Sequence, residues 1–292
     1  MFGITTRNVA NDNKAPEFRS TFPVDMAMKK WDTTDPTLIV SRLNQGKSMQ
    51  TSTSSAEVNF SSAMFDYNNG WSSNATGANT TLHSWMWKRA KGFMDVVAFD
   101  GNGTSGRTVA HSLSVIPELM ICKRRSSTED WTVYNSTSGA THFLNLNNAD
   151  AANTAGNVWN DTAPTSTVFS VGNSSRVNSS GHTYIAYLFA TLDGISKVGS
   201  FVGNGTSQNI DCGFSAGARF VLLKNTSAAH GWHLFDTTRG IVAGNDPYLL
   251  LNTNAGQYTN LDMIDPHNSG FTVLDHGEIN GNGNTIIFYA IA

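Results

Sequence analysis

The sequence predicts an all-β protein made of three tandem antiparallel β-sandwich units of jelly-roll type, preceded by an N-terminal extended arm. The apolar runs have strand lengths, and Asn, Ser, Thr and Gly dominate the polar residues, a mixture that favours strands and turns over long helices. Sequence landmarks also recur about every 100 residues, the size of one sandwich domain. A chain of 292 residues is long enough for two or three such domains.

The repeat is clearest between the second and third parts of the chain. Segment 95–109 (DVVAFDGNGTSGRTV) matches segment 197–211 (KVGSFVGNGTSQNID), and their GNGT blocks begin at Gly101 and Gly203. The closing segments GHTYIAYLFA and GNTIIFYAIA also align. Landmarks that keep their order and spacing predict a duplicated structural unit.

A more divergent copy precedes these two. VDMAMKK matches ELMICKR, which aligns Lys29 with Lys123, and SWMWKRA matches the two closing segments. The first copy lacks a clear GNGT block, so residues 1–20 are either a degenerate version of that hairpin or a separate extended arm. The predicted units span residues 21–91, 92–192 and 193–292.

The predicted strands follow from local patterns. Asn102-Gly103 predicts a tight hairpin between VVAF and TVAHSL, because type I′ turns need positive φ at both central residues. LMIC and FVLL are continuous apolar runs typical of buried strands, and Cys122 within LMIC is expected in the core. Trp131 and Trp232 open matching strands, which favours core anchors over exposed sugar-stacking residues.

Composition argues against several partners. Charged residues make up only 14% of the chain and the net charge is −3, so the basic face that nucleic-acid binding requires is not expected. The longest apolar runs, such as Tyr184–Ala190, are much shorter than the roughly 20 residues of a membrane span, so no membrane insertion is expected. The first residues predict no secretory signal. With two cysteines, stability is expected to come from burial rather than from a disulfide framework.

No motif predicts catalysis, a cofactor or a bound metal. GNGTSG (101–106) matches G-x-G-x-x-G, but the residues that follow it predict a strand instead of the helix that dinucleotide binding needs. His276 and Glu278 share a strand face and could bind a cation weakly, but a polar loop before a hairpin explains them better. Asp236 lies in a turn-like context, which accounts for it without catalysis. The sequence therefore predicts a protein that is not an enzyme.

Assembly residues can be proposed from the first unit. Trp85 and Trp87 flank Met86, so the two indoles should share one face of the closing strand. Without its own hairpin the first unit would have a vacant sheet edge, which invites strand addition. The sequence predicts a homo-oligomer, most simply a trimer, with an anchoring arm at residues 1–20. The residues predicted to mediate assembly are Phe2, Ile4, Phe18, Trp85 and Trp87. The alternative is that residues 1–20 fold back on their own unit.

The same motifs resemble a known repeat. GFMDVVAF with GNGT, the P-x-L/F-x-x-x-K strand, D-W-x-V-Y, WNDTAPTSTVFSVG and TYIAYLFA are similar to a repeat of unknown function in structural virion proteins of tailed, often marine, bacteriophages. The resemblance covers residues 21–292. This chain is shorter than the longer members of that group, which argues against a self-contained long fibre.

The resemblance implies a non-enzymatic virion protein of fibre type or attached to the particle surface, assembled in the host bacterial cytoplasm. Such a protein would serve particle assembly and host-surface attachment. Its partners would be other virion proteins of the capsid or tail, and a host surface glycan or protein. The alternatives are a capsid decoration protein or tail adaptor that stabilises the particle, and a glycan-binding or glycan-processing tailspike module.

Overall fold

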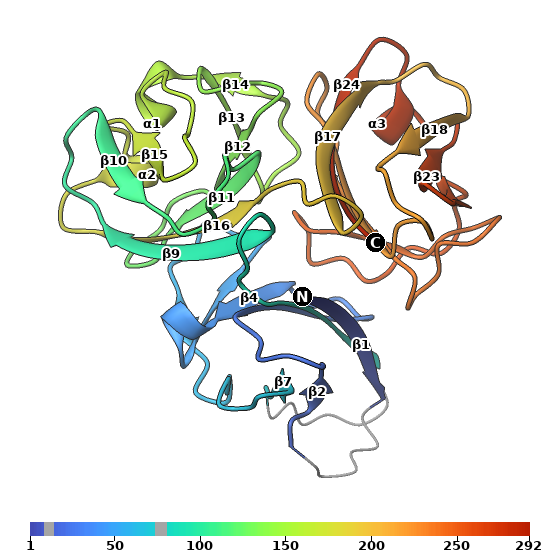
Figure 1. Cartoon of the computed structure of the whole chain (residues 1–292), viewed down its shortest axis with the longest axis horizontal. Helices are drawn as coiled ribbons and strands as arrows, with labels where there is room; N and C mark the ends of the chain where they lie inside the picture. The colour runs from blue at the N-terminus through green and yellow to red at the C-terminus, as the bar shows by residue number, and fades with distance from the viewer. Residues whose placement is uncertain (9–14, 74–80) are drawn as a thin grey trace.

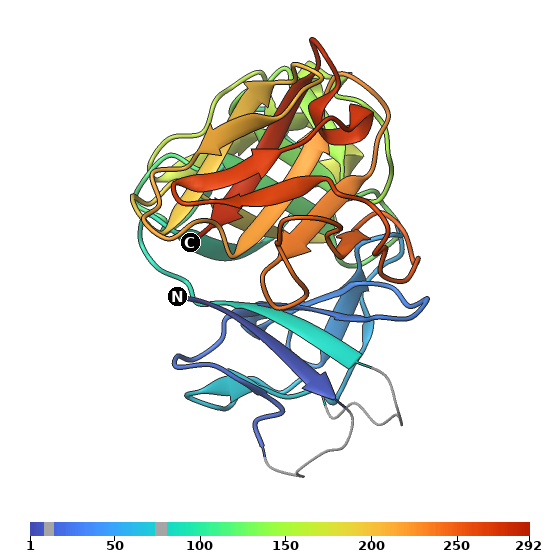
Figure 2. The same cartoon turned by 90° about the vertical axis from the view of Figure 1, so that its right-hand side faces the viewer.

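The computed structural model describes residues 1–8, 15–73 and 81–292. It is nearly all β, with 42% strand and 5% helix in several antiparallel sheets, which confirms the predicted all-β class. Three bodies of antiparallel strands surround a common centre, and their long strands lie toward that centre (Figure 1). Figure 2 shows the third body from its outer side, with the first body below it.

The first unit contains a six-stranded sheet in the order β1-β8-β3-β4-β5-β6 and a second layer formed by β2 and β7. A short 3-10 helix, η1 (Arg42–Asn44), follows β4. The strands are β1 (Phe2–Asn8), β2 (Phe18–Arg19), β3 (Met26–Trp31), β4 (Leu38–Ser41), β5 (Lys47–Gln50), β6 (Val58–Asn59), β7 (Gly70–Trp71) and β8 (Thr81–Trp87).

The second unit has the same order of strands in its large sheet, β9-β16-β11-β12-β13-β14, and β10 pairs with β15 in the second layer. Its helices are α1 (Gly156–Trp159) and α2 (Ser175–Asn178). The strands are β9 (Met94–Asp100), β10 (Arg107–Ala110), β11 (Leu119–Arg124), β12 (Thr132–Asn135), β13 (His142–Asn145), β14 (Asn153–Thr154), β15 (Val168–Val171) and β16 (Thr183–Phe189).

The third unit repeats the arrangement with a five-stranded sheet, β17-β24-β19-β20-β21, and a three-stranded layer, β18-β23-β22. Its one helix in the described structure is α3 (Gly277–Asn280). The strands are β17 (Ser196–Val202), β18 (Gln208–Asp211), β19 (Phe220–Asn225), β20 (Trp232–Asp236), β21 (Tyr248–Leu250), β22 (Ile264–His267), β23 (Gly270–Val273) and β24 (Thr285–Ile291).

Strand register gives the equivalent positions in the three units. The strands β3, β11 and β19 pair with the closing strands β8, β16 and β24 of their units. In each pair the first residue of the former strand lies opposite the last residue of the closing strand. Counted from this point, Lys30 is equivalent to Lys123 and Lys224, so the predicted alignment of Lys29 with Lys123 is wrong by one residue. The KK pair allowed either alignment, and only the pairing decides between them.

The sheet edge that was expected to be vacant is occupied by β1. Phe2–Asn8 pairs antiparallel with β8 over its whole length, from Phe2 opposite Trp87 to Asn8 opposite Thr81. β1 thus takes the place that β9 and β17 hold in the other units. The prediction of an anchoring arm is therefore wrong for residues 2–8. These residues make their backbone hydrogen bonds within their own unit. Part of the predicted arm, residues 9–14, lies outside the described residues.

The GNGT blocks do not form the predicted two-residue hairpins. β9 belongs to the large sheet and β10 to the second layer, so the loop between them crosses from one layer to the other. Gly101 allows a close approach, since a Cβ there would lie 2.1 Å from the Ser179 carbonyl oxygen. The buried Asn178 holds the loop by donating to the Thr104 carbonyl oxygen at 2.8 Å, and Asn280 does the same in the third unit. Asn-Gly signals a turn but does not specify which sheet the next strand joins.

Among the described residues, four apolar clusters form the interior. Each unit has its own cluster between its two layers. The fourth cluster is shared, because the large sheets of all three units contribute side chains to it. Trp131 and Trp232 are 0% and 1% exposed in this shared core, which confirms them as core anchors. Cys122 is also fully buried, as expected.

Candidate functional site

The residues predicted to mediate assembly lie inside the molecule. Trp85, Trp87 and Phe2 belong to the shared core, with Ile4 packed against it, and Phe18 belongs to the first unit's own core. The Phe2 ring lies 5.0 Å from the Trp87 ring, measured between centroids. These residues therefore do not form an exposed assembly surface, since the packing of this chain buries them. Formation of a homo-oligomer stays a prediction.

The three units are joined by a cyclic set of polar contacts around the shared core. A lysine at the same position of each unit donates a hydrogen bond to a backbone carbonyl of a neighbouring unit. Lys123 Nζ is 3.1 Å from the Ser54 oxygen of the first unit, and also contacts the carbonyl oxygens of Arg124 and Glu129 at 3.0 and 2.8 Å. Three acceptors match the three N–H groups of an ammonium.

The other two lysines complete the cycle. Lys224 of the third unit donates to the Ala149 oxygen of the second unit at 2.8 Å, and Lys30 of the first unit donates to the Asn254 oxygen of the third at 3.3 Å. Burial lowers the pKa of all three lysines to about 8. The carbonyl oxygens oppose this effect, because they only accept hydrogen bonds and so favour the charged form.

A backbone hydrogen bond accompanies each lysine contact. In every case the donor is a backbone N–H from the segment that follows β5, β13 or β21. The acceptor is the carbonyl oxygen of the residue just after the lysine-bearing strand of the next unit. The three bonds run from Glu57 to Arg125 at 2.9 Å, from Ala152 to Thr226 at 2.9 Å and from Gln257 to Asp32 at 3.1 Å. The same two contacts at all three boundaries close the units into a ring.

The tryptophans of the shared core add a third contact. Trp131 Nε1 donates to the Gln50 carbonyl oxygen of the first unit at 2.9 Å, and Trp232 Nε1 donates to the Asn145 carbonyl oxygen of the second at 2.9 Å. Each indole is therefore satisfied by a neighbouring unit. Thr37, which is fully buried, stands at the equivalent position of the first unit. Sugar stacking on these two indoles is excluded by their burial.

The boundary between the third and first units carries buried charges. Trp85 Nε1 donates to Asp236 Oδ2 at 3.1 Å, and Arg239 Nε donates to the same oxygen at 2.7 Å. The Arg239 guanidinium lies 5.5 Å from the Trp85 ring centroid. Asp236 also accepts from the backbone N–H groups of its own turn, as its sequence context predicted. Its additional role at the boundary was missed, because it depends on a contact with a distant part of the chain.

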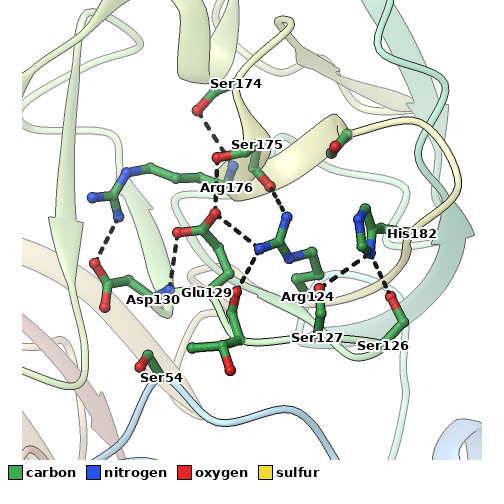
Figure 3. Close-up of polar contacts among 12 residues, drawn as sticks. Ser54, Arg124, Ser126, Ser127, Glu129, Asp130, Ser174, Ser175, Arg176 and His182 are labelled. Carbon is green, nitrogen blue, oxygen red and sulfur yellow. Dashed lines mark hydrogen bonds and ion pairs between the residues drawn. The ribbon is translucent and has the colours of Figure 1, made fainter.

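A polar cluster lies at one end of the second unit, where α2 meets the loop after β11 (Figure 3). Ser175 Oγ donates to Glu129 at 2.8 Å, and Arg176 pairs with Asp130 at 3.2 Å. Ser126 Oγ lies 3.0 Å from His182 Nδ1. A serine hydrogen-bonded to a histidine could act as a nucleophile with its general base. In catalytic sites of this kind a third group orients the histidine, and no carboxylate of the described residues does so for His182. The contacts instead fix the loop against α2.

Glu278 interacts with a histidine other than the one predicted. Glu278 Oε2 lies 2.8 Å from His233 Nε2, and its other oxygen lies 4.0 Å from His230 Nδ1. The hydrogen bond with His233 lowers the pKa of Glu278, and burial lowers the pKa of His233. Within residues 1–8, 15–73 and 81–292, no group of three or more His, Cys, Asp or Glu side chains is arranged to hold a metal ion.

A polar row in the first unit was missed by the sequence analysis. Thr5, Ser84 and Lys29 face one another across β1, β8 and β3, on the side of the sheet that covers the first unit's own core. The equivalent residues of the second unit are apolar, as are those of the third. The strand pairing identifies this row, because it shows which residues of the other two units occupy the same positions. Those residues are apolar.

Comparison with known proteins gives one match. The family described as Domain of unknown function (DUF7483) matches residues 19–292. The chain belongs to this family. No curated protein and no solved structure matches it. The matched residues include every strand of the three large sheets except β1, so the family domain comprises all three units. Among the helices of the described residues, none has the length and apolar character of a membrane span.

Proposed function

We propose that this protein is a non-enzymatic structural component of a bacteriophage virion, of fibre type or attached to the particle surface. In this role it contributes to particle assembly and to attachment to the host surface. Its partners are other virion proteins of the capsid or tail, together with a glycan or protein on the host. The proposal starts from the sequence resemblance to virion repeat proteins.

The observation that carries this proposal is the cyclic set of contacts around the shared core. A lysine contact and a backbone hydrogen bond recur at all three boundaries, and they hold the three units in fixed relative positions. Such an arrangement suits a rigid building block. The segments 51–57, 148–155 and 252–257 contact the neighbouring units at this ring and are rich in Ser, Thr, Asn and Ala. Loops held by a rigid scaffold are common positions for recognition.

A second candidate role is that of a capsid decoration protein or tail adaptor. The pairing of β1 with β8 favours it, because this segment is then an edge strand of the first unit's sheet and not a free arm. A decoration protein needs only such a body and one docking surface. A glycan-binding tailspike module is a further alternative.

Quantitative mass spectrometry of purified phage particles tests the proposal. The protein should co-purify with particles after density-gradient centrifugation, and immunogold labelling should place it on the particle surface. Hundreds of copies per particle indicate decoration, whereas tens or fewer indicate a fibre or adaptor. Presence in infected cells combined with absence from purified particles would refute a structural role.

A further inference from the structure

A hydroxyl, an imidazole and a carboxylate form a hydrogen-bonded series at the edge of the first unit's large sheet. Thr6 Oγ1 is 3.0 Å from His83 Nδ1, and His83 Nε2 is 2.5 Å from Asp32 Oδ1. The three residues come from β1, β8 and the position just after β3. A nucleophile, a base within hydrogen-bond reach and a third group that orients the base are the parts of a nucleophilic site. The contact between Ser126 and His182 lacks the third group, and this one has it.

The carboxylate determines which ring nitrogen of His83 carries the hydrogen. Burial acts to raise the pKa of Asp32, but interactions with His83 and Thr81 outweigh burial and lower the pKa. An ionised carboxylate only accepts hydrogen bonds, so Nε2 of His83 is the donor to it. Nδ1 then keeps its lone pair, and the Thr6 hydroxyl donates to that lone pair. His83 is therefore in the form that can take a proton from Thr6.

Thr6 is open to solvent, whereas its base is shielded. Thr6 is exposed, His83 is only 4% exposed, and β1 is the edge strand of its sheet. The Lys88 N–H donates to the Met1 carbonyl oxygen, and hydrogen bonding alternates along an antiparallel pair. The N–H of Thr6 therefore points away from β8, to the open edge. A reacting carbonyl group at the Thr6 hydroxyl can place its developing negative oxygen near this N–H.

The other two units show that the fold does not require these three residues. The equivalent positions are found from the strand pairing and from the backbone contact just after the lysine-bearing strand. They are occupied by Ala98, Ile185 and Arg125 in the second unit and by Ser200, Ile287 and Thr226 in the third. Among the described residues, only the first unit combines a hydroxyl, an imidazole and a carboxylate here. The same sheet forms without them, so their presence in the first unit calls for another explanation.

We propose that Thr6, His83 and Asp32 form a site that hydrolyses esters by acyl transfer to Thr6. The Thr6 oxygen bonds to the ester carbonyl carbon while its proton passes to His83 Nδ1, and the alcohol leaves with that proton. The acyl group stays on Thr6 until water attacks it. The water gives a proton to His83, the acid is released, and Thr6 recovers the proton. Asp32 is a positioning residue, because it keeps Nδ1 of His83 free to accept.

This inference adds an activity to the proposed virion role and departs from the non-enzymatic part of that role. Thr6 lies before residue 19, where the family match begins, so the site is assigned to this chain and not to the family. Sequence reasoning missed the site because residues 6, 32 and 83 form no local motif. Only the pairing of β1 with β8 brings the hydroxyl to the imidazole.

Hydrolysis of p-nitrophenyl acetate by the full chain tests the site. Thr6→Val keeps the side-chain shape without the hydroxyl, and His83→Ile installs the residue that both other units have. Each variant should lower the rate by about a hundredfold, a usual contribution of a positioned base. The double variant should be no slower than either single variant, because the two groups act as one unit. Ser126→Ala, at the serine–histidine contact without a carboxylate, should hydrolyse the ester as the unaltered protein does.

Two further measurements separate this site from hydrolysis by exposed imidazoles. A fluorophosphonate reagent should become attached to Thr6, as located by mass spectrometry of peptides, and His83→Ile should abolish the labelling. Nitrogen NMR should show His83 Nδ1 without a hydrogen in the unaltered protein and with one in Asp32→Asn, whose amide can donate to Nε2.

The proposal is overturned if Thr6→Val hydrolyses the ester as fast as the unaltered protein, if the reagent leaves Thr6 unlabelled, or if His83 Nδ1 carries a hydrogen in the unaltered protein. Melting temperatures of the variants should match that of the unaltered protein, since Thr6 is exposed and isoleucine occupies the His83 position in two units. Association with particles is measured separately, so a negative result here leaves the virion role standing.

Discussion

Lys29 and Lys30 are neighbours in the sequence but have opposite surroundings. Successive side chains of a strand point to opposite faces, so Lys30 reaches the contacts between units and Lys29 reaches the interior of the first unit. The sequence pattern predicted a strand here and a lysine position that recurs in all three units. It could not tell which lysine holds that position, because the two residues are chemically identical and only the pairing with β8 distinguishes them.

Substitution of Lys123 tests how much one of the contacts between units contributes to stability. Lys123→Met keeps the length of the side chain but leaves three buried carbonyl oxygens without a donor. We expect the free energy of unfolding to fall by about 2–4 kcal/mol, the range for orphaned buried polar groups. Urea unfolding followed by tryptophan fluorescence measures the change. Lys47→Met, at a more exposed lysine, should stay within about 0.5 kcal/mol of the unaltered protein.

The pH dependence of the same variant has a defined sign. The pKa of Lys123 is about 8 in the folded chain, below the value of about 10.4 for an unfolded lysine. Between these values the unfolded state binds more protons, so this group makes folding more favourable as the pH rises from about 8 to 10. The stability gap between the unaltered protein and Lys123→Met should therefore widen over this range. A gap that narrows would show that the carbonyl oxygens raise the pKa instead.

At the scale of elements, strand lengths were predictable and sheet membership was not. The apolar runs around Cys122 and Leu222 correspond to the buried strands β11 and β19, since a continuous apolar run needs burial on both faces. The strands that flank each GNGT block belong to different layers, which no local pattern indicates. The residues that hold these crossing loops are Asn178 and Asn280, which lie more than 70 positions further along the chain.

These asparagines give a paired prediction. Asn178 Nδ2 donates to two carbonyl oxygens, and its Oδ1 accepts from the backbone of the GNGT loop. Asn178→Ala and Asn280→Ala should each lower the free energy of unfolding by about 2–4 kcal/mol, because several buried backbone groups lose their partners. Hydrogen exchange should increase first in the GNGT loop of the altered unit. Equal exchange in both units after one substitution would contradict this explanation.

The first strand provides another test at this scale. Deleting residues 1–8 removes β1, which exposes the edge of β8 and the side chains that Phe2 covers. We expect a clearly lower melting temperature and self-association, because an uncovered strand edge pairs with other chains. Differential scanning calorimetry and light scattering measure the two effects. Unchanged melting together with loss of particle association would restore the anchoring role that the sequence suggested.

At the scale of the whole molecule, the repeat predicted three units but not their arrangement as a ring. Repeats are visible because the same residues recur, such as Trp131 and Trp232. The lysines that join the units recur too, but their acceptors are backbone carbonyls of different residues, Ser54, Ala149 and Asn254, so the sequence does not show what each lysine contacts. The polar row was hidden for a related reason, since it is a departure from the repeat.

The shared core predicts that the three units unfold together. Trp232 is 1% exposed, contributes to a core made by all three large sheets and donates a hydrogen bond to Asn145 of the second unit. Trp232→Ala should therefore cost about 3–5 kcal/mol and lower the midpoint of one common transition. In calorimetry, the measured enthalpy of both proteins should equal the van't Hoff enthalpy. Val202→Ser, at a valine that is 60% exposed in the same unit, should melt as the unaltered protein does. If Trp232→Ala instead splits the transition in two, with only the third unit melting early, the units are independent domains and the contacts between them add little stability.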